Sequence, residues 1–246
     1  FKFQGQNGGA PRWWFHASLS LSSSENVSGQ FFPRYVSVDR DMIIGRGYKD
    51  SHGKVYTFKA NDSAVNLNEY ENPIINESTG TNNRYVAYDW SGLSQETQII
   101  TGNLNQNTGI YNNSNIAKKA GSFVSYKFGY SMDIDRKLMI IGNHDAVYTK
   151  TDSTTATEAG CVFVYERTSF TDVSYNLLEI ITSATKDGTD DENLIQQRNY
   201  FGHAIKINGD DYQNGKNTAL ITAKGNNIDS TNSDAGCAYF FVRNGS

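Results

Sequence analysis

Hydrophobic and polar residues alternate in short runs along most of the chain, and polar or glycine-containing segments separate these runs. Examples are Phe31–Asp39, Met42–Gly45 and Lys54–Lys59. Alternation with a period of two is typical of strands that bury one face, and short continuous hydrophobic runs are typical of buried strands. Long stretches of helical periodicity are absent from the sequence. The pattern therefore predicts an all-β protein built from many short strands.

One arrangement of these runs occurs twice near the end of the chain, at Phe128–Arg167 and Phe201–Arg243. Each copy opens with Phe-Gly and an alternating strand, and continues with a hydrophobic strand that ends in a small residue, Gly142 or Ala223. Each then crosses a polar loop and closes with Ala-Gly-Cys and an aromatic-rich strand that ends in arginine. Recurrence at this spacing indicates a repeat architecture.

A third copy lies nearer the N-terminus. Its segment Val38–Gly45 matches Ile134–Gly142, and Gly53–Phe58 matches the glycine-led last strand of the same copy. A fourth and weaker copy is expected within Asn83–Tyr126, where Thr97–Asn103 would form its second strand.

A further strand is expected after two of the copies, at Val65–Asn68 and Tyr175–Thr182, which makes each copy four-stranded. Four-stranded antiparallel units in tandem predict a β-propeller, here with about four blades. The N-terminal strand Trp13–Leu21 would complete the last blade and so remove an exposed sheet edge. The predicted organisation is an N-terminal arm at 1–12 and a propeller domain at 13–246.

The order of these elements resembles the FG-GAP repeat, the unit of the integrin-α-type β-propeller. The name-giving pair is present at Phe128-Gly129 and Phe201-Gly202, and Ile140–Asn143 stands where the family has its Gly-Ala-Pro. The glycine-led strands Gly160–Tyr165 and Gly236–Phe241 match the third strand of the family repeat.

The first and the weaker copies depart from the family pattern. Phe32-Pro33 replaces Phe-Gly in the first copy, where Ile43–Arg46 stands in the place of Gly-Ala-Pro, and Arg84-Tyr85 replaces Phe-Gly in the weaker copy. The resemblance implies an extracellular, cell-surface or virion-surface setting. It also implies protein or glycan partners, bound by the loops on one face of the propeller.

Composition narrows the range of partners. The net charge is -4 with a pI of about 5.6, and basic residues do not cluster among aromatic ones, so no nucleic-acid partner is expected. Hydrophobic runs fall short of the roughly 20 residues of a spanning helix, so no membrane insertion is expected. Cys161 and Cys237 occupy equivalent repeat positions and are expected to be buried free thiols, because such positions lie beyond disulfide reach.

The best candidate for a metal site is the polar segment 208–217. It offers Asn208, Asp210 and Asp211 as oxygen ligands for calcium, the hard cation that many FG-GAP hairpins bind. Lys216 interrupts this segment and the usual spacing of aspartates is missing, so a polar hairpin without an ion is the alternative. The sequence predicts no other cofactor.

Residue patterns typical of catalysis are lacking in the sequence. The four histidines, His16, His52, His144 and His203, do not have metal-ligand spacing, and no G-x-S-x-G motif occurs. Carboxylates cluster in segment 187–192, which is typical of a solvated loop. Two carboxylates about 5 to 9 Å apart across a cleft would instead support glycoside hydrolysis.

The chain is therefore predicted to be a non-enzymatic binding or structural module that presents polar loops for protein or glycan recognition. The connectors expected to carry this role are Gly47–Gly53, Asn143–Ala159, Lys186–Asn199 and Gly225–Ala235. Two alternatives stay open: a carbohydrate-active propeller hydrolase, and a purely structural subunit of a large extracellular or viral assembly.

Overall fold

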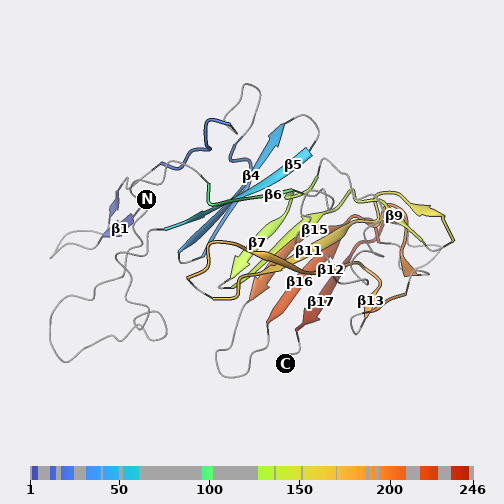
Figure 1. The fold of residues 1–246 in the computed structure, drawn as a ribbon. Helices are drawn as coiled ribbons and strands as arrows, with labels where there is room; N and C mark the ends of the chain where they lie inside the picture. Colours follow the sequence, from blue (N-terminus) through green and yellow to red (C-terminus); the bar gives the residue numbers. More distant parts are fainter. Residues whose placement is uncertain are drawn as a thin grey trace, which may run out of the picture.

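The described residues of a computed structural model form antiparallel β-sheets and contain no α-helix, which confirms the all-β prediction (Figure 1). These residues are 2–4, 12–14, 18–24, 32–39, 41–49, 52–60, 96–101, 127–135, 137–150, 152–169, 171–186, 189–191, 194–208, 217–226 and 234–243. Three larger sheets and three two-stranded ribbons account for the strands among them.

The first sheet has the strand order β3-β4-β5-β6. Its strands are β3 (Val36–Asp39), β4 (Met42–Lys49), β5 (His52–Lys59) and β6 (Gln98–Thr101). All neighbours are antiparallel, and β4 and β5 form one long hairpin from Met42 paired with Lys59 to Lys49 paired with His52. The expected connector Gly47–Gly53 is therefore wrong, because most of it belongs to paired strands.

The second sheet has the order β7-β8-β11-β12. Its strands are β7 (Met132–Asp135), β8 (Leu138–Asn143), β11 (Cys161–Glu166) and β12 (Asn176–Ile181). Here the strand expected at Tyr175–Thr182 is confirmed as the fourth strand of the sheet.

The third sheet has three strands in the order β15-β16-β17. They are β15 (Phe201–Asn208), β16 (Thr218–Ala223) and β17 (Cys237–Val242), drawn in orange to red in Figure 1. The ribbons pair β1 (Lys2–Gln4) with β2 (Arg12–Trp14), β9 (Tyr148–Thr149) with β10 (Thr155–Ala156), and β13 (Thr185–Lys186) with β14 (Thr189–Asp190).

The three sheets pack face to face, with two hydrophobic junctions between them. In every third strand, the residues three and five positions after the leading glycine are aromatic. In the second and third sheets they face the preceding sheet, and in the first and second sheets the alternate residues face the next one. The aromatic residues are Tyr56 and Phe58 in β5, Phe163 and Tyr165 in β11, and Tyr239 and Phe241 in β17. We call the packing of the first on the second sheet the first junction, and that of the second on the third sheet the second junction.

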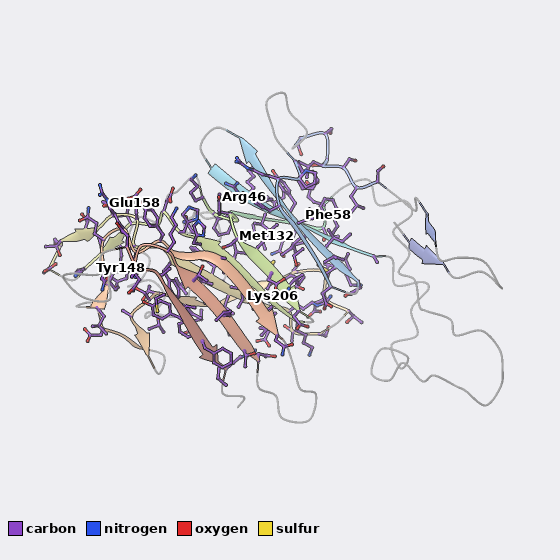
Figure 2. The ribbon with its side chains drawn as sticks, turned by 180° about the vertical axis from the view of Figure 1, so that it is seen from behind. Arg46, Phe58, Met132, Tyr148, Glu158 and Lys206 are labelled. Carbon is purple, nitrogen blue, oxygen red and sulfur yellow. The ribbon has the colours of Figure 1, made fainter. Side chains whose placement is uncertain are left out.

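The phenylalanine that opens each repeat packs its ring on these aromatics of its own sheet. Ring centroids lie 5.5 Å apart for Phe32 and Tyr56, 5.3 Å for Phe128 and Phe163, and 5.3 Å for Phe201 and Tyr239. Phe58, on the first sheet, is labelled in Figure 2. The repeated phenylalanine is thus a core residue of each sheet.

Backbone contacts at the junctions explain the glycines of the motif. Gly129 and Gly202, the glycines of Phe-Gly, have φ values of 76° and 85°, a region that disfavours side chains. In addition, a Cβ at Gly160 would collide with the backbone of Phe201, and one at Gly53 with the carbonyl of Phe128. The leading glycine of one sheet therefore receives the opening phenylalanine of the next.

Each junction also carries a two-pronged ion pair from the arginine that closes a repeat. Arg167 donates to both carboxylate oxygens of Asp41 at 2.8 and 3.0 Å, and its side chain is fully buried. Arg243 donates to both oxygens of Glu166 at 3.0 Å, with about a third of each side chain exposed. Equivalent arginines therefore bridge to the preceding sheet in different environments.

Asp133, at the centre of β7, links the first strands of all three sheets. It is 4% exposed, accepts a hydrogen bond from the hydroxyl of Ser37 on β3, and accepts the backbone N–H of Ile207 on β15 at 2.9 Å. Lys206, labelled in Figure 2, places its Nζ 2.9 Å from the same carboxylate. The first strands of the sheets consequently lie side by side around one acidic group.

The structure corrects the weaker copy that was expected within Asn83–Tyr126. Thr97–Asn103 does not begin a separate sheet, because its residues Gln98–Thr101 form β6 at the edge of the first sheet, with Ile100 opposite Val55. Ile100 is 2% exposed and lies in the core of the first junction, so pairing there buries the strand. The expected strand at Val65–Asn68 lies outside the described residues.

The sequence match between the first copy and the copy at Phe128–Arg167 is shifted by one residue. Gly45 lies opposite Tyr56, as Ile141 lies opposite Phe163, so Arg46 and not Gly45 occupies the place of Gly142. The side chain of Arg46 is buried there and donates to the carbonyl of Phe128 at 2.9 Å. An arginine thus stands where the copy at Phe128–Arg167 requires a glycine.

One expectation about the chain ends differs from the structure. The segment Trp13–Leu21 does not complete the third sheet: Arg12–Trp14 pairs with Lys2–Gln4, and Leu21 is buried against Tyr56 and Phe58 of the first sheet. Leu21 can lie there because no preceding sheet among the described residues covers these aromatics.

Both cysteines are free, but only Cys161 is buried. Cys237 is exposed, because β17 is the edge strand of the third sheet whereas β11 is paired on both sides.

Candidate functional site

Five aromatic rings gather where the first strands of the three sheets begin. We call this set, Tyr35, Tyr130, His144, Tyr200 and His203, the ring cluster. The centroid of Tyr130 lies 5.2 Å from Tyr35 and 4.4 Å from His144. His203 lies 5.8 Å from Tyr130 and 5.2 Å from His144, and Tyr200 lies 6.3 Å from His144. The cluster thus spans residues from all three repeats.

The local fold brings these rings together in a regular way. Tyr130 and His203 each follow the phenylalanine of a repeat by two positions, at or just before the first strand. His144 follows β8, and Tyr200 immediately precedes β15. Because β7 and β15 lie side by side and β8 pairs with β7, the four residues meet at one end of the second and third sheets.

Basic side chains surround the ring cluster. Lys224 Nζ lies 4.7 Å from the centroid of the Tyr200 ring, and Lys127 Nζ lies 5.4 Å from that of Tyr130. The guanidinium carbons of Arg34 and Arg46 each lie 6.0 Å from the centroid of Tyr35. Cations at such distances are attracted to the ring faces, so the rings hold a set of positive charges at this end of the sheets.

His144 is the buried member of the cluster and is held neutral. It is 4% exposed, and its Nε2 lies 3.1 Å from Asp145 Oδ1. Burial, followed by the charge of His203 and of nearby lysines, lowers the pKa of His144 to about 3. Within the described part of the chain, its buried Nδ1 has no hydrogen-bond partner. The neutral ring therefore presents an acceptor at Nδ1, provided Nε2 carries the proton toward Asp145.

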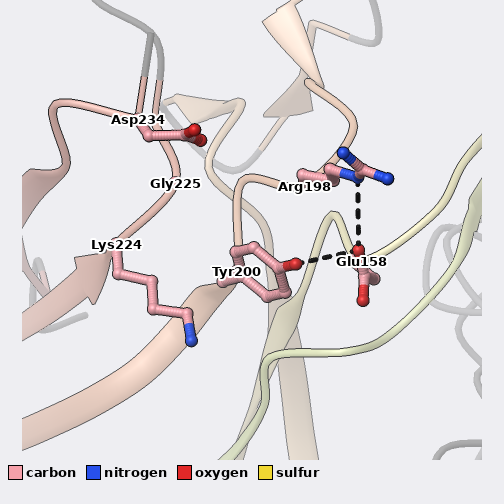
Figure 3. Close-up of a pocket in the computed structure, with 6 residues that line it drawn as sticks. All are labelled: Glu158, Arg198, Tyr200, Lys224, Gly225 and Asp234. Atoms are coloured by element: carbon pink, nitrogen blue, oxygen red, sulfur yellow. Dashed lines mark hydrogen bonds and ion pairs between the residues drawn. The ribbon is translucent and has the colours of Figure 1, made fainter.

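A pocket of about 460 Å³ adjoins the ring cluster through Tyr200 and Lys224. Its lining residues are Glu158, Arg198, Tyr200, Lys224, Gly225 and Asp234 (Figure 3). The hydroxyl of Tyr200 donates to Glu158 at 2.9 Å, and Arg198 Nε lies 3.7 Å from the same carboxylate oxygen. That hydrogen bond raises the pKa of Tyr200, so its hydroxyl stays protonated. The pocket thus carries both signs of charge and one fixed aromatic hydroxyl.

Backbone strain concentrates around this pocket. Among the described non-glycine residues, five have positive φ, and four of these line the pocket: Glu158 at 55°, Arg198 at 58°, Tyr200 at 54° and Asp234 at 56°. Such conformations are uncommon outside glycine and cluster where function constrains the backbone. Backbone hydrogen bonds hold them, since Arg198 and Tyr200 donate to the carbonyls of Thr157 and Glu158 at 2.9 Å.

The two acidic members of the pocket occupy the same repeat position. Glu158 precedes Ala-Gly-Cys in the copy at Phe128–Arg167, and Asp234 precedes Ala-Gly-Cys in the copy at Phe201–Arg243. Both have positive φ, and so do the glycines Gly160 and Gly236 that follow them. The strained acid is therefore a repeated feature that was present in the sequence as a recurring acidic residue before Ala-Gly-Cys.

Three of the expected connectors supply pocket residues. Asn143–Ala159 contributes Glu158, Lys186–Asn199 contributes Arg198, and Gly225–Ala235 contributes Gly225 and Asp234. Sequence reasoning treated His144 and His203 as unrelated, whereas the structure places them together. The signal that could have joined His203 to Tyr130 is their shared position two residues after the opening phenylalanine.

The calcium candidates are only partly within the described residues. Asn208 is the exposed last residue of β15, and its carbonyl lies 3.4 Å from the hydroxyl of Thr218. Asp210 and Asp211 lie outside the described residues, so calcium binding at this loop stays a prediction. In the segments that the structure describes, no group of three or more His, Cys, Asp or Glu side chains is arranged to hold a metal ion.

No family model matches the chain, and no curated protein is significantly similar to it. Within the described ranges, no helix has the length and hydrophobicity needed to cross a membrane.

Proposed function

We propose that the chain is an FG-GAP-type β-propeller module that binds a protein or glycan partner at the ring cluster and the adjoining pocket, without catalysing a reaction. The resemblance supports a location for such a module on the surface of a cell or virus particle. The three described sheets would be consecutive blades, with β3, β7 and β15 as their inner strands.

Contacts between the sheets support the propeller arrangement. The inner strands of neighbouring sheets contact each other, β3 with β7 and β7 with β15, and they share Asp133. At each of the two junctions, the aromatic face of one sheet packs on the aliphatic face of the sheet before it. A stack in which every sheet uses the same two faces is what a propeller requires.

The observation that carries the binding function is the clustering of four strained residues around one pocket. Their backbone conformations cost of the order of 1 kcal/mol or more each and persist only where surrounding contacts fix them. Here these contacts hold Glu158, Tyr200 and Arg198 in place before any partner arrives. A preorganised site loses less conformational entropy on binding, which favours recognition.

The chemistry of the site suits a polar partner with some apolar surface. Tyrosine and histidine rings present an apolar face with a polar tip, and lysine, arginine and carboxylate groups lie beside them. Sugars and polar peptide loops both present hydroxyl or amide groups next to C–H surface. The arrangement of Glu158, which accepts from Tyr200 and pairs with Arg198, suits ligand orientation better than proton donation to a leaving group.

A binding screen against glycans, combined with an assay on chromogenic glycosides, tests this proposal. We expect binding without turnover, and a loss of at least about tenfold in affinity in Tyr200→Ala and Lys224→Ala. Lys137→Ala is the matched control, because Lys137 lies at the opposite end of β8 from His144. Turnover that disappears in Glu158→Gln would instead establish the hydrolase alternative. Equal binding by all variants would mean that the partner binds at another site.

A further inference from the structure

Exposed hydrophobic side chains gather at the two ends of the stack of sheets. On the first sheet, Val36 is 62% and Val38 is 64% exposed, both from β3. On the third sheet, Leu220, Phe240 and Val242 are 45%, 67% and 47% exposed and lie on the face that points away from the second sheet. Clusters of exposed hydrophobic residues of this kind mark interaction surfaces.

The exposed residues of the third sheet occupy positions that are buried in the second. The strand pairing makes Leu220 equivalent to Ile140, and Phe240 equivalent to Val164. Ile140 and Val164 are 3% and 7% exposed, because the third sheet covers them in the second junction. The outer face of the third sheet therefore repeats one half of a junction, without its covering sheet among the described residues.

The exposed valines of the first sheet repeat the other half. Val38 is equivalent to Ile134 in β7 and to Ile207 in β15. Ile134 is 4% and Ile207 is 5% exposed, since each packs against the preceding sheet. The described residues form no sheet that precedes the first one, and Leu21 covers Tyr56 and Phe58 but leaves the two valines of β3 exposed.

Gly236 shows the same incomplete junction in the backbone. It has φ of 77°, as Gly160 has 81°, and it leads the third strand of its sheet. At Gly160 the backbone of Phe201 from the next sheet fills the space beside the glycine. At Gly236 the nearest atom to an added Cβ is the carbonyl of Lys224 from the same sheet, at 3.4 Å. Among the described residues, no opening phenylalanine of a next sheet is one of the nearest neighbours of Gly236.

We propose that the third sheet of one molecule docks on the first sheet of a second copy of this chain, so that copies associate head to tail. The two halves of the contact occupy the positions that meet in both internal junctions, and both expose hydrophobic side chains. Within one molecule the second sheet lies between these faces and keeps them apart. The inference uses the stacking of the sheets alone and is independent of ligand binding at the ring cluster.

The expected contact follows the internal junctions. There, β15 packs on both β7 and β8 of the preceding sheet. By equivalence, β3 of the second copy packs on β15 and β16 of the first, with Val38 beside Leu220. β17, whose outer edge is unpaired in the described sheet, lies next to this contact. Because the two faces differ, the association is heterologous and continues until a ring closes or the copies are exhausted.

Sedimentation velocity on Phe240→Asp and Val38→Asp, alone and mixed, tests the proposal. The wild-type chain is expected to associate as its concentration rises, and each variant is expected to sediment as a monomer. An equal mixture of the two variants should form a one-to-one complex that grows no further, because each supplies one intact face. Both side chains are largely exposed, so near-UV circular dichroism should match that of the wild type.

Leu194→Asp is the matched control, since Leu194 is 59% exposed and lies outside the two end faces. It is expected to associate as the wild type does. A wild-type chain that stays monomeric up to its solubility limit overturns the proposal. Loss of association in Phe240→Asp together with full association in Val38→Asp overturns it too, because that result means a symmetric contact between two third sheets.

Discussion

The first and second junctions are built from equivalent repeat positions, yet the closing arginine has a different environment in each. Arg167 and its partner Asp41 have side chains that are 0% and 7% exposed, whereas Arg243 and Glu166 are 37% and 32% exposed. Both pairs are two-pronged, with distances of 2.8 to 3.0 Å. The same repeat position therefore keeps the same hydrogen-bond geometry in both junctions, whereas its contribution to stability depends on its burial.

The difference arises from what covers each junction. The first junction is enclosed by the second sheet with its fourth strand and by Tyr175, which is 1% exposed and contacts the Arg167 guanidinium through its ring. The second junction ends at β17, the edge of a three-stranded sheet. Water cannot reach and solvate the charged groups in the enclosed first junction. It can do so at the exposed edge of the second junction.

Removing the buried carboxylate should have the largest effect. In Asp41→Asn, the buried guanidinium of Arg167 loses its counter-charge, and we expect a loss of about 3–5 kcal/mol in the free energy of unfolding, measured with guanidinium chloride. The double variant Asp41→Asn with Arg167→Met should recover part of this loss, because it removes the buried guanidinium, while the buried ammonium of Lys59, 3.9 Å from Asp41 in the wild type, stays in place. A loss below about 1 kcal/mol in the single variant would mean that the pair is solvated.

Replacing the equivalent glycines should separate backbone conformation from close approach. Gly236→Ala places a side chain at positive φ in ordinary van der Waals contact and without a collision, for which we expect a loss of about 1–2 kcal/mol. Gly160→Ala adds a collision with the backbone of Phe201 and should cost at least about twice as much. Thermal and chemical unfolding of the two variants measure the difference. Equal losses would show that the backbone of Phe201 can move away from residue 160 without a loss in the free energy of unfolding.

The ring cluster should make stability depend on pH. The pKa of His144 is lowered to about 3 in the folded chain from an ordinary 6.5, so the unfolded chain binds the proton more tightly. Its contribution is complete above pH 6.5 and is lost as pH falls from 6.5 toward 3. Between pH 7 and pH 5 this one group should lower the free energy of unfolding by about 2 kcal/mol.

The control for this pH dependence is His144→Gln, which removes the titrating group and keeps a polar side chain. Unfolding measured at pH 7 and pH 5 should show a smaller loss in the variant than in the wild type, by about those 2 kcal/mol. His203, Asp145, Lys127, Lys224 and Arg46 face or influence His144 and stay in place in both proteins. An unchanged difference between the two pH values would mean that His144 is solvated when folded.

The exposed ion pair should have the smallest effect. Arg243→Gln removes a pair whose side chains are each about a third exposed, and we expect a loss below about 1 kcal/mol that shrinks further at high salt. Unfolding at low and high sodium chloride measures both quantities. A loss as large as that of Asp41→Asn would remove the distinction between the two junctions.

Most strands could be predicted from the sequence, because alternation and repeated order are local properties of the chain. The copies at Phe128–Arg167 and Phe201–Arg243 emerged with the right strands in the right order. The placement of Gln98–Thr101 could not be predicted, since its short hydrophobic pattern fits any open strand edge. Only the free edge of β5 and the apolar space beside Val55 decide where it pairs.

The site was harder to predict than the fold. The connectors that line the pocket could be identified as polar loops, but their meeting at one point depends on how the sheets stack. His144 has no signature in the sequence, because its burial comes from Tyr130, Tyr200 and His203, which belong to other strands and loops. Positive φ at Glu158 and Tyr200 is likewise set by backbone hydrogen bonds between two distant segments.

Asp133 has a consequence for how the stack comes apart. Its single carboxylate accepts hydrogen bonds from Ser37 in the first sheet and from the backbone of Ile207 in the third, so detaching either outer sheet breaks a hydrogen bond to this buried acid. Tandem repeats often unfold progressively from an end, because each unit contacts only its neighbours. Here one acidic group ties three consecutive units together, and we expect them to melt in a single cooperative transition.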